Sequence, residues 1–286
     1  MEKYRVGIVG ATGMVGQRFV LLTANHPWFT PVVLAASAHS AGKTYAQAIE
    51  GKWHMAEPIP ESVKSMIVMD AEADAEEIAR QVDFVFCAVN MKKDEIKALE
   101  EKYAKLECPV VSNNSAHRHT PDVPMVVPEI NAGDVKLHHG IISNPNCSTI
   151  ITLTAINALR KLSPIRDMVV STYQAVSGAG AGGPIELQNE VDALRAGKPY
   201  APKVFAHQIA YNVIPQIGGE QRDGYTSEEM KLQNEGRKIL HLPDMNVART
   251  CVRVPVVRSH SISAAVHFVH HISCLLYTSP SPRDCS

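Results

Sequence analysis

Cys147 is the residue of this chain whose surroundings best suit nucleophilic chemistry. Residues 143–150 read Ser-Asn-Pro-Asn-Cys-Ser-Thr-Ile, which predicts a turn that delivers Cys147 to the start of an apolar helix. The free amide hydrogens and the positive dipole end of such a helix stabilise a thiolate, so we expect the thiol pKa to fall from about 8.5 toward neutrality. The alternative is a cysteine that simply packs, as most free cysteines do.

The other cysteines help to weigh these two interpretations. The chain has six, of which Cys87 and Cys251 lie inside apolar runs and are expected in the core, while Cys108 precedes a proline at a predicted strand entry. No C-x-x-C pair occurs, so a zinc site or a redox dithiol has little support, and we expect no metal. Cys147 therefore stands apart as the candidate nucleophile.

Composition narrows the class of protein. The chain has 286 residues, 45% of them hydrophobic, and a formal net charge of -1. Its length suggests about two domains with a large core. The absence of a long basic run argues against nucleic acid or an anionic membrane as the partner and leaves a small-molecule substrate. Neither a signal peptide nor a membrane-spanning run is apparent, so we expect a cytoplasmic protein with reduced cysteines.

The first half of the chain alternates between strand and helix patterns. Such alternation predicts an α/β fold with a doubly wound, parallel, Rossmann-type sheet. The expected strands are 4–9, 32–36, 82–89 and 109–112, and the expected helices are 14–24, 71–80 and 92–106.

A glycine-rich turn joins the first predicted strand to the first predicted helix. It reads Gly-Ala-Thr-Gly-Met-Val-Gly over residues 10–16, and glycines in this context let the backbone approach a pyrophosphate at a helix N-terminus. A merely structural turn is the alternative. We expect the cofactor to contact residues of this turn, namely Gly10, Thr12, Gly13, Met14 and Val15.

The end of the second predicted strand bears on which dinucleotide binds. Enzymes that select NAD usually place a carboxylate there, but residues 36–43 read Ala-Ser-Ala-His-Ser-Ala-Gly-Lys and contain none. Hydroxyl groups with His39 and Lys43 suit a 2′-phosphate better, so we expect NADP, contacted by Ser37, His39 and Ser40. A solvated polar loop without influence on selectivity is the alternative.

The pattern changes after Cys147 and predicts a second, α+β domain. It contains strand-like runs at 168–176, 248–257 and 262–271, a helix that ends near Gly197, and a second helix whose capping box is Thr226 with Glu229. We divide the chain into a dinucleotide-binding domain at 1–145, a catalytic and dimerisation domain at 146–273, and a tail at 274–286. The tail abandons the strand pattern and has linker composition, which suggests a non-native end and an incomplete second domain.

Several separated motifs can be matched to one known family. They are Gly10-Ala11-Thr12-Gly13, Ser40-Ala41-Gly42-Lys43, Asn113-Asn114-Ser115-Ala116-His117-Arg118, Val127-Pro128-Glu129, Asn144-Pro145-Asn146-Cys147-Ser148-Thr149, Gln174-Ala175-Val176-Ser177-Gly178-Ala179-Gly180, and Arg253 with His260. Together they resemble the aspartate-β-semialdehyde dehydrogenases over nearly the whole chain. The resemblance implies NADPH-dependent reductive dephosphorylation of β-aspartyl phosphate to aspartate semialdehyde, in the biosynthesis of lysine (through diaminopimelate), threonine, methionine and isoleucine.

The resemblance also implies roles for individual residues. Cys147 would form the acyl-enzyme and His260 would act as acid and base, taking the thiol proton and later returning one. Arg253 would clamp the substrate α-carboxylate. The remaining expected contacts are Gln174 to the substrate, Arg118, Lys231 and Asn146 to the phosphate, and Ser177 and Gly178 to the nicotinamide side of the site. Relatives commonly form homodimers, sometimes homotetramers.

Two departures from the family pattern stand out. The family usually has an arginine where this chain has His39, so we expect a weakened preference for NADP over NAD, which the variant His39→Arg would restore. Relatives also continue with further strands and a helix beyond the point where this chain ends, and an unpaired sheet edge invites aggregation.

Three competing functions can be compared with these motifs. N-acetyl-γ-glutamyl-phosphate reductase performs the same chemistry, but its cysteine turn usually has glycine before the cysteine and Tyr-Pro after it. Glyceraldehyde-3-phosphate dehydrogenase has a second cysteine four residues after the first, which is absent here. A truncated, non-catalytic NADP-binding module is the rival from another class.

Overall fold

The computed structural model describes residues 2–272, and its chain divides into two compact units. The first unit comprises Met1–Val126 and Ala132–Pro145, and the second comprises Val127–Asn131 and Asn146–Ser286. The expected non-native tail, residues 274–286, lies outside the described residues. Within the described part of the chain no helix is both long and apolar enough to span a membrane.

The first unit is built on a six-stranded sheet in which every neighbouring pair of strands is parallel. The spatial order β3-β2-β1-β4-β5-β6 reverses direction between β1 and β4, as in a doubly wound fold. The predicted fold class is therefore confirmed. The strands are β1 (Tyr4–Val9), β2 (Phe29–Ala36), β3 (Met69–Asp70), β4 (Phe84–Cys87), β5 (Val110–Ser112) and β6 (Ile141–Ser143).

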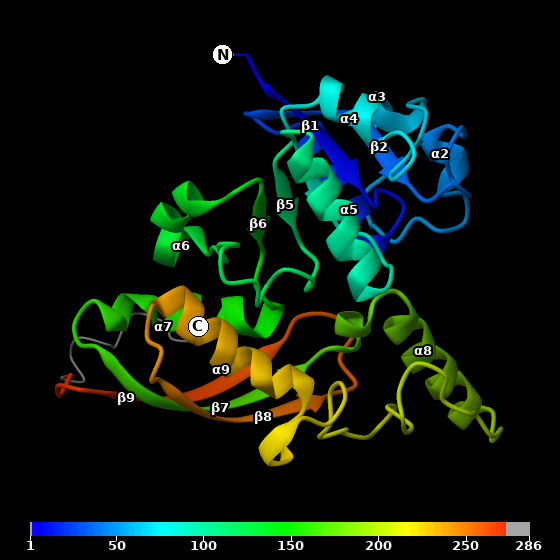
Figure 1. The fold of residues 1–286 in the computed structure, drawn as a ribbon. Coiled ribbons are helices and arrows are strands. Elements are labelled where there is room, and N and C mark those ends of the chain that lie inside the picture. The colour runs from blue at the N-terminus through cyan, green and yellow to red at the C-terminus, as the bar shows by residue number, and fades with distance from the viewer. Residues whose placement is uncertain (1, 273–286) are drawn as a thin grey trace. The chain divides into compact units, whose positions relative to one another are not determined.

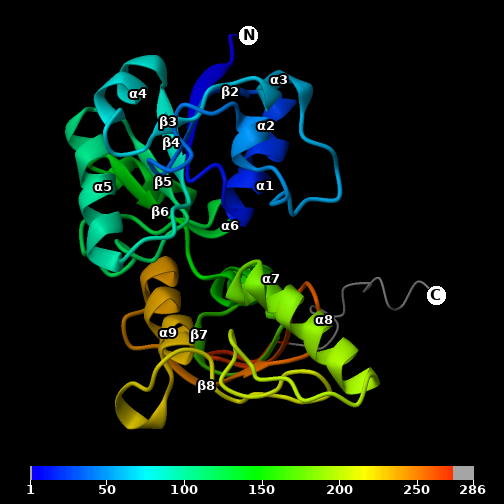
Figure 2. The ribbon, with the colours of Figure 1, turned by 90° about the vertical axis from the view of Figure 1, so that its right-hand side faces the viewer.

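Helices cover both faces of this sheet (Figure 2). On one face Val20 packs with Ile8 and Leu34 of the sheet, and on the other Ile78 packs with Val85 and other strand residues. All five of these side chains are fully buried, and β1 and β2 contribute apolar side chains to both cores. The helices are α1 (Met14–Ala24), α2 (Tyr45–Ala48), α3 (Glu61–Lys64), α4 (Ala75–Gln81) and α5 (Lys93–Lys105), with a 3₁₀ turn at Ala132–Leu137.

The second unit contains a three-stranded mixed sheet with helices on one side. Its central strand β7 (Ile165–Gln174) pairs in parallel with β8 (Asn246–Arg253) and antiparallel with β9 (Ser261–Phe268). Helices α7 (Cys147–Arg160) and α9 (Ser227–Leu240) lie over this sheet (Figure 1). The other elements are α6 (Pro128–Asn131), α8 (Gly182–Arg195) and 3₁₀ turns at Val176–Ala179 and Arg222–Gly224.

Side chains of β7 alternate between the two faces of this sheet. Met168, Val170 and Thr172 are buried, whereas Val169 and Tyr173 on the opposite face are 48% and 46% exposed. A strand with period-two alternation and one covered face is expected to behave in this way. The uncovered face carries large apolar side chains that a monomer leaves in water.

Candidate active site

Helix α7 begins at Cys147, as the sequence predicts. Its N-cap is Asn146, whose side-chain oxygen accepts hydrogen bonds from the amides of Ser148 at 3.0 Å and Thr149 at 3.3 Å. Asparagine is among the best N-cap residues because it satisfies amides that have no partner within the helix. The cap fixes where the helix starts, and Cys147 is therefore held, exposed, at its first position.

His260 lies beside the sulfur. Its Nε2 is 3.3 Å from Cys147 Sγ, although the two residues are 113 positions apart in the sequence. The amide of Ala175 donates to Nδ1 at 3.0 Å, so Nδ1 is an acceptor and a neutral ring carries its proton on Nε2. Burial and the charge of Arg253 lower the pKa of His260, which keeps the ring neutral near pH 7. In this tautomer Nε2 donates toward the sulfur.

Glu228 joins three of the predicted site residues, although the sequence analysis did not select it. Its carboxylate accepts from Asn146 Nδ2 at 2.9 Å, from Gln174 Nε2 at 3.1 Å and from Lys231 Nζ at 2.8 Å. The residue is 7% exposed. Burial alone would raise the pKa of Glu228, but Lys231 and the other donors outweigh burial and hold the pKa below its ordinary value. Glu228 is therefore an anion at neutral pH.

A second buried carboxylate supports the cysteine turn. Glu235 is fully buried and accepts from the Asn146 amide at 2.7 Å. Glu228, Lys231 and Glu235 recur at i, i+3 and i+7, which places them on one face of α9. This spacing is the signal by which the sequence could have indicated the two glutamates.

The expected fall of the Cys147 pKa is wrong for the protein without substrate. Protein atoms packed around the sulfur raise the pKa, and the negative charge of Glu228 raises it further. The amide and hydroxyl of Ser148 and the charge of Lys231 lower it, but not by enough to compensate. The prediction considered only the start of α7 and missed an anion contributed by α9.

Arg253 is buried close enough to His260 for its charge to lower the pKa of the histidine. Its Nη1 donates to the Ala175 carbonyl at 2.7 Å, and the residue borders a cavity of about 320 Å³ together with Phe205, Gly218 and neighbouring residues. A Cβ at Gly178 would lie 2.7 Å from Arg253 Nη1, so a side chain there would displace this guanidinium. Ser177 and Gly178 are thus placed beside the candidate catalytic pair. Their predicted contact with the nicotinamide stays a prediction.

A separate cavity in the first unit is the candidate cofactor site. Its volume is about 340 Å³, and it is lined by ends of parallel strands and the glycine turn, including Gly10, Thr12, Gly13 and Ser37. Gly10 has φ 91°, and a Cβ at Gly16 would lie 2.0 Å from the Gly10 carbonyl oxygen. The turn therefore requires glycine for its tight geometry, which fits a dinucleotide pyrophosphate held by backbone amides.

Four other residues expected at the cofactor do not line this cavity, namely Met14, Val15, His39 and Ser40. The cavity instead includes Asp70, the last residue of β3, and Glu72, which follows this strand. A strand of only two residues carries too weak a pattern for the sequence to show it. The roles of the four residues stay predictions.

Arg118 belongs to the first unit, unlike the other expected phosphate ligands. Its Nη2 donates to the Asn113 carbonyl at 3.2 Å. Asn113 in turn accepts from the Asn144 side chain at 2.8 Å, which links two of the motifs noted in the sequence. The expected contact of Arg118 with phosphate stays a prediction.

Comparison with known proteins gives the family. The model of the semialdehyde dehydrogenase NAD binding domain matches residues 5–138, and that of the semialdehyde dehydrogenase dimerisation domain matches residues 156–278. The aspartate-semialdehyde dehydrogenase of Aquifex aeolicus is 42% identical over 276 residues, covering 94% of this chain and 75% of the relative. The chain belongs to the aspartate-semialdehyde dehydrogenase family. The Bacillus subtilis member is 36% identical over 269 residues, covering 91% of this chain and 72% of that relative.

Solved structures of the family have the same fold. Aspartate semialdehyde dehydrogenase II from Vibrio cholerae, complexed with ASA, has a TM-score of 0.82 and 33% identity, covering 95% of this chain and 76% of its own. The Candida albicans aspartate semialdehyde dehydrogenase with NADP has a TM-score of 0.73 and 28% identity, covering 95% of this chain and 73% of its own. The chain spans about three quarters of each of these family members.

Proposed function

We propose that this aspartate-semialdehyde dehydrogenase family member reduces L-β-aspartyl phosphate to L-aspartate 4-semialdehyde with NADPH, and runs in reverse with inorganic phosphate. The observation that carries the proposal is the contact of Cys147 Sγ with His260 Nε2 at the first residue of α7. The names of the relatives and of the solved family members support the substrate, and the Candida albicans complex supports NADP.

Cys147 is the proposed nucleophile. Its thiolate attacks the acyl carbon of the substrate, the C–O bond to phosphate breaks, and a thioester forms on Sγ. Bound NADPH supplies the hydride that reduces the thioester carbonyl. The resulting oxyanion collapses to the aldehyde as the C–S bond breaks and the thiolate returns. The residues of the glycine turn and the adjoining cavity would hold the cofactor, because their backbone leaves room for a pyrophosphate.

His260 acts here as a hydrogen-bond donor. With the Ala175 amide on Nδ1, the Nε2 proton points to the sulfur and stabilises the thiolate. The same proton can stabilise the oxyanion that forms on the neighbouring carbon. Once the thiol has lost its proton to solvent, this sequence of steps balances without transfer of a proton from the ring, because the thiolate is both the attacking and the leaving group. The expectation that His260 takes up the thiol proton requires the other tautomer.

The charged groups around Cys147 match the groups of the proposed substrate. Arg253 would bind the α-carboxylate, because arginine pairs with carboxylates in a planar, bidentate way. The anion Glu228 would bind the α-ammonium group, while Lys231 and Arg118 would bind the phosphate. Gln174 and Asn146 are held by Glu228 and would help to fix the substrate position.

Glu228 also connects substrate binding to thiol activation. Its charge is one of the causes of the raised Cys147 pKa, and a bound ammonium group would offset that charge. We therefore infer that the substrate itself promotes formation of the thiolate. Alkylation of Cys147 by iodoacetamide, followed against pH, should begin at lower pH in Glu228→Gln than in the unmodified protein. An unchanged alkylation profile would contradict this coupling.

The proposed activity is tested by following phosphate-dependent formation of NADPH from aspartate semialdehyde. The unmodified chain should be active and Cys147→Ser inactive, and mass spectrometry should find an aspartyl adduct on Cys147 when aspartyl phosphate is supplied without NADPH. Equal rates in the two proteins would exclude the covalent mechanism. Binding of NADPH without turnover or adduct would favour the non-catalytic module.

We also propose that the protein forms a homodimer through the uncovered face of the β7–β8–β9 sheet. Val169 and Tyr173 are half-exposed on this face, and the matching family model describes a dimerisation domain. Light scattering should give twice the chain mass, and Tyr173→Asp with Val169→Asp should give the monomer. A tetramer, the biosynthetic pathway and a cytoplasmic location remain predictions from the sequence.

A further inference from the structure

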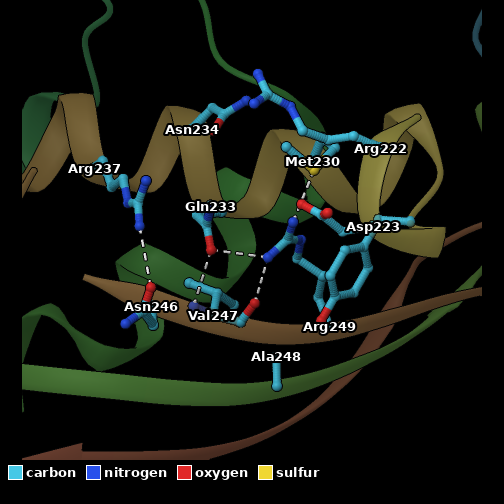
Figure 3. A pocket seen from close by; sticks show the side chains of 11 residues that line it. Arg222, Asp223, Met230, Gln233, Asn234, Arg237, Asn246, Val247, Ala248 and Arg249 are labelled. Atoms are coloured by element: carbon cyan, nitrogen blue, oxygen red, sulfur yellow. Dashed lines mark hydrogen bonds between the residues drawn. The ribbon is translucent and has the colours of Figure 1, made fainter. Parts of the chain in front are cut away.

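A second cavity of the catalytic unit lies on the opposite side of α9 from the cysteine. Its volume is about 550 Å³, within the range of small-molecule sites. Figure 3 shows it between α9 and β8, with the arginine side chains at its walls and the Arg249 guanidinium hydrogen-bonded to Gln233 and Val247. Three cations and one carboxylate line the cavity. The full lining is Arg222, Asp223, Tyr225, Met230, Gln233, Asn234, Arg237, Asn246, Val247, Ala248 and Arg249.

Arg249 is a buried cation whose hydrogen-bond partners are neutral. The residue is 7% exposed, and its Nη atoms donate to the Gln233 side-chain oxygen, the Val247 carbonyl and the Met230 sulfur. Its Nε has no hydrogen-bond partner among the described residues, and no described carboxylate forms a salt bridge with Arg249. Its guanidinium carbon lies 3.8 Å from the Tyr225 ring centroid. Buried charges are usually paired, because leaving them unpaired is costly.

Nearby groups do not neutralise this cation. Glu229 attracts it, but the Glu229 oxygens already accept from the amide and hydroxyl of Thr226 and from the Cys251 amide. Arg237 adds a second positive charge and repels Arg249. Arg222 is exposed and lines the cavity. The cavity therefore concentrates positive charge around an open volume.

We propose that this cavity binds a small oxyanion ligand, a carboxylate or a phosphate group carried by a metabolite, at a site distinct from the Cys147 site. The planar guanidinium group of arginine suits both ligands, because a carboxylate and a phosphate each present two oxygens in one plane to its paired N–H donors. A purely structural role for Arg249 would account for its contacts to β8 and α9. It would not account for the further arginines around an open cavity.

Met230 provides a local readout for binding. Its sulfur contacts Arg249 Nη2 at 2.8 Å, so an anion at the guanidinium changes the environment of the Met230 methyl group. The experiment titrates protein labelled with ¹³C-methyl methionine with inorganic phosphate, and separately with malonate, at constant ionic strength. The Met230 signal is assigned with Met230→Leu, and Met66, which lies in the other unit, serves as the internal control.

The expected result is a saturable shift of the Met230 signal while that of Met66 stays constant. Arg222→Glu should weaken binding about tenfold or more, because it turns an attraction into a repulsion. Arg195→Glu makes the same charge change on exposed α8, which is not part of the cavity lining, and should leave the affinity unchanged. Response to phosphate alone assigns a phosphorylated ligand, and response to malonate alone assigns a carboxylate.

Two outcomes overturn the proposal. One is a Met230 signal that does not respond to either anion. The other is a shift that Arg222→Glu and Arg195→Glu weaken equally, which would reflect net charge and not a site. Because Met230 reports on the cavity and not on turnover, these outcomes are independent of the proposed dehydrogenase activity.

Discussion

The two ring nitrogens of His260 can be tested separately by replacing the residue with glutamine and with asparagine. The glutamine side chain can place an N–H donor near the position of Nε2, whereas the asparagine side chain can place an oxygen acceptor near Nδ1. If catalysis depends on hydrogen-bond donation from Nε2, His260→Asn removes one preorganised donor that would stabilise the thiolate and the oxyanion. Loss of such a donor costs about 10² to 10³ in kcat, or about 3–4 kcal/mol. We expect His260→Gln to retain at least about tenfold more activity than His260→Asn.

The expected loss of activity in His260→Asn depends on a single contact, the 3.3 Å distance between His260 Nε2 and Cys147 Sγ. The assay is phosphate-dependent NADPH formation at saturating substrate, with the thermal unfolding midpoint measured for each variant to exclude misfolding. The pH profile provides an independent check, because an amide cannot titrate. If His260 instead accepts the thiol proton, glutamine and asparagine remove the base alike. Equal losses in the two variants would refute the donor role.

Three further predictions concern the residues that build the two sites. The pKa of Glu228 is lowered, so its carboxylate stabilises the fold fully above its ordinary value of 4.5, and this contribution is lost as the pH falls through the folded value. Urea titrations below pH 4.5 should therefore show a steeper loss of stability in the unmodified protein than in Glu228→Gln. Asn146→Ala should lower the free energy of unfolding by about 1 kcal/mol or more through the lost cap. Asn146→Asp should be no more stable than Asn146→Ala, although aspartate can cap a helix, because its carboxylate would replace a hydrogen-bond donor to Glu228 by a like charge. Gly16→Ala should abolish NADPH binding measured by fluorescence, because its Cβ would lie 2.0 Å from the Gly10 carbonyl oxygen; binding of normal affinity would show that the turn can relax.

Local signals in the sequence were sufficient for most of the helices and strands. The turn at residues 143–150 predicts the start of α7, and the Thr226 and Glu229 capping box forms as expected at the start of α9. The strand-like run expected at 168–176 appears as β7 at Ile165–Gln174, and the alternation of strands with helices also appears in the structure. β3 and β6 were missed, and β3 has only two residues, which are too few to show a period.

The candidate site was harder to predict because its electrostatics depend on residues far apart in the sequence. The motif around Cys147 indicates a helix start and a nucleophile, both from adjacent residues. The carboxylate that raises the Cys147 pKa comes from Glu228, whose side chain hydrogen-bonds Asn146 across 82 positions. A glutamate three residues before a lysine on a charged helix is usually solvated, and only the helix face that Glu228 shares with Glu235 could have indicated another role.

The residue at which helix α9 starts determines which of its side chains face each of the two sites of the catalytic unit. Its capping box fixes the first residue of the helix, and the angular position of every later residue follows from 3.6 residues per turn. Glu228 and Lys231 consequently meet the start of α7, while Met230 and Gln233 border the arginine-lined cavity. A shift of one residue in the start of α9 would rotate all four side chains by about 100° and separate Glu228 from Asn146.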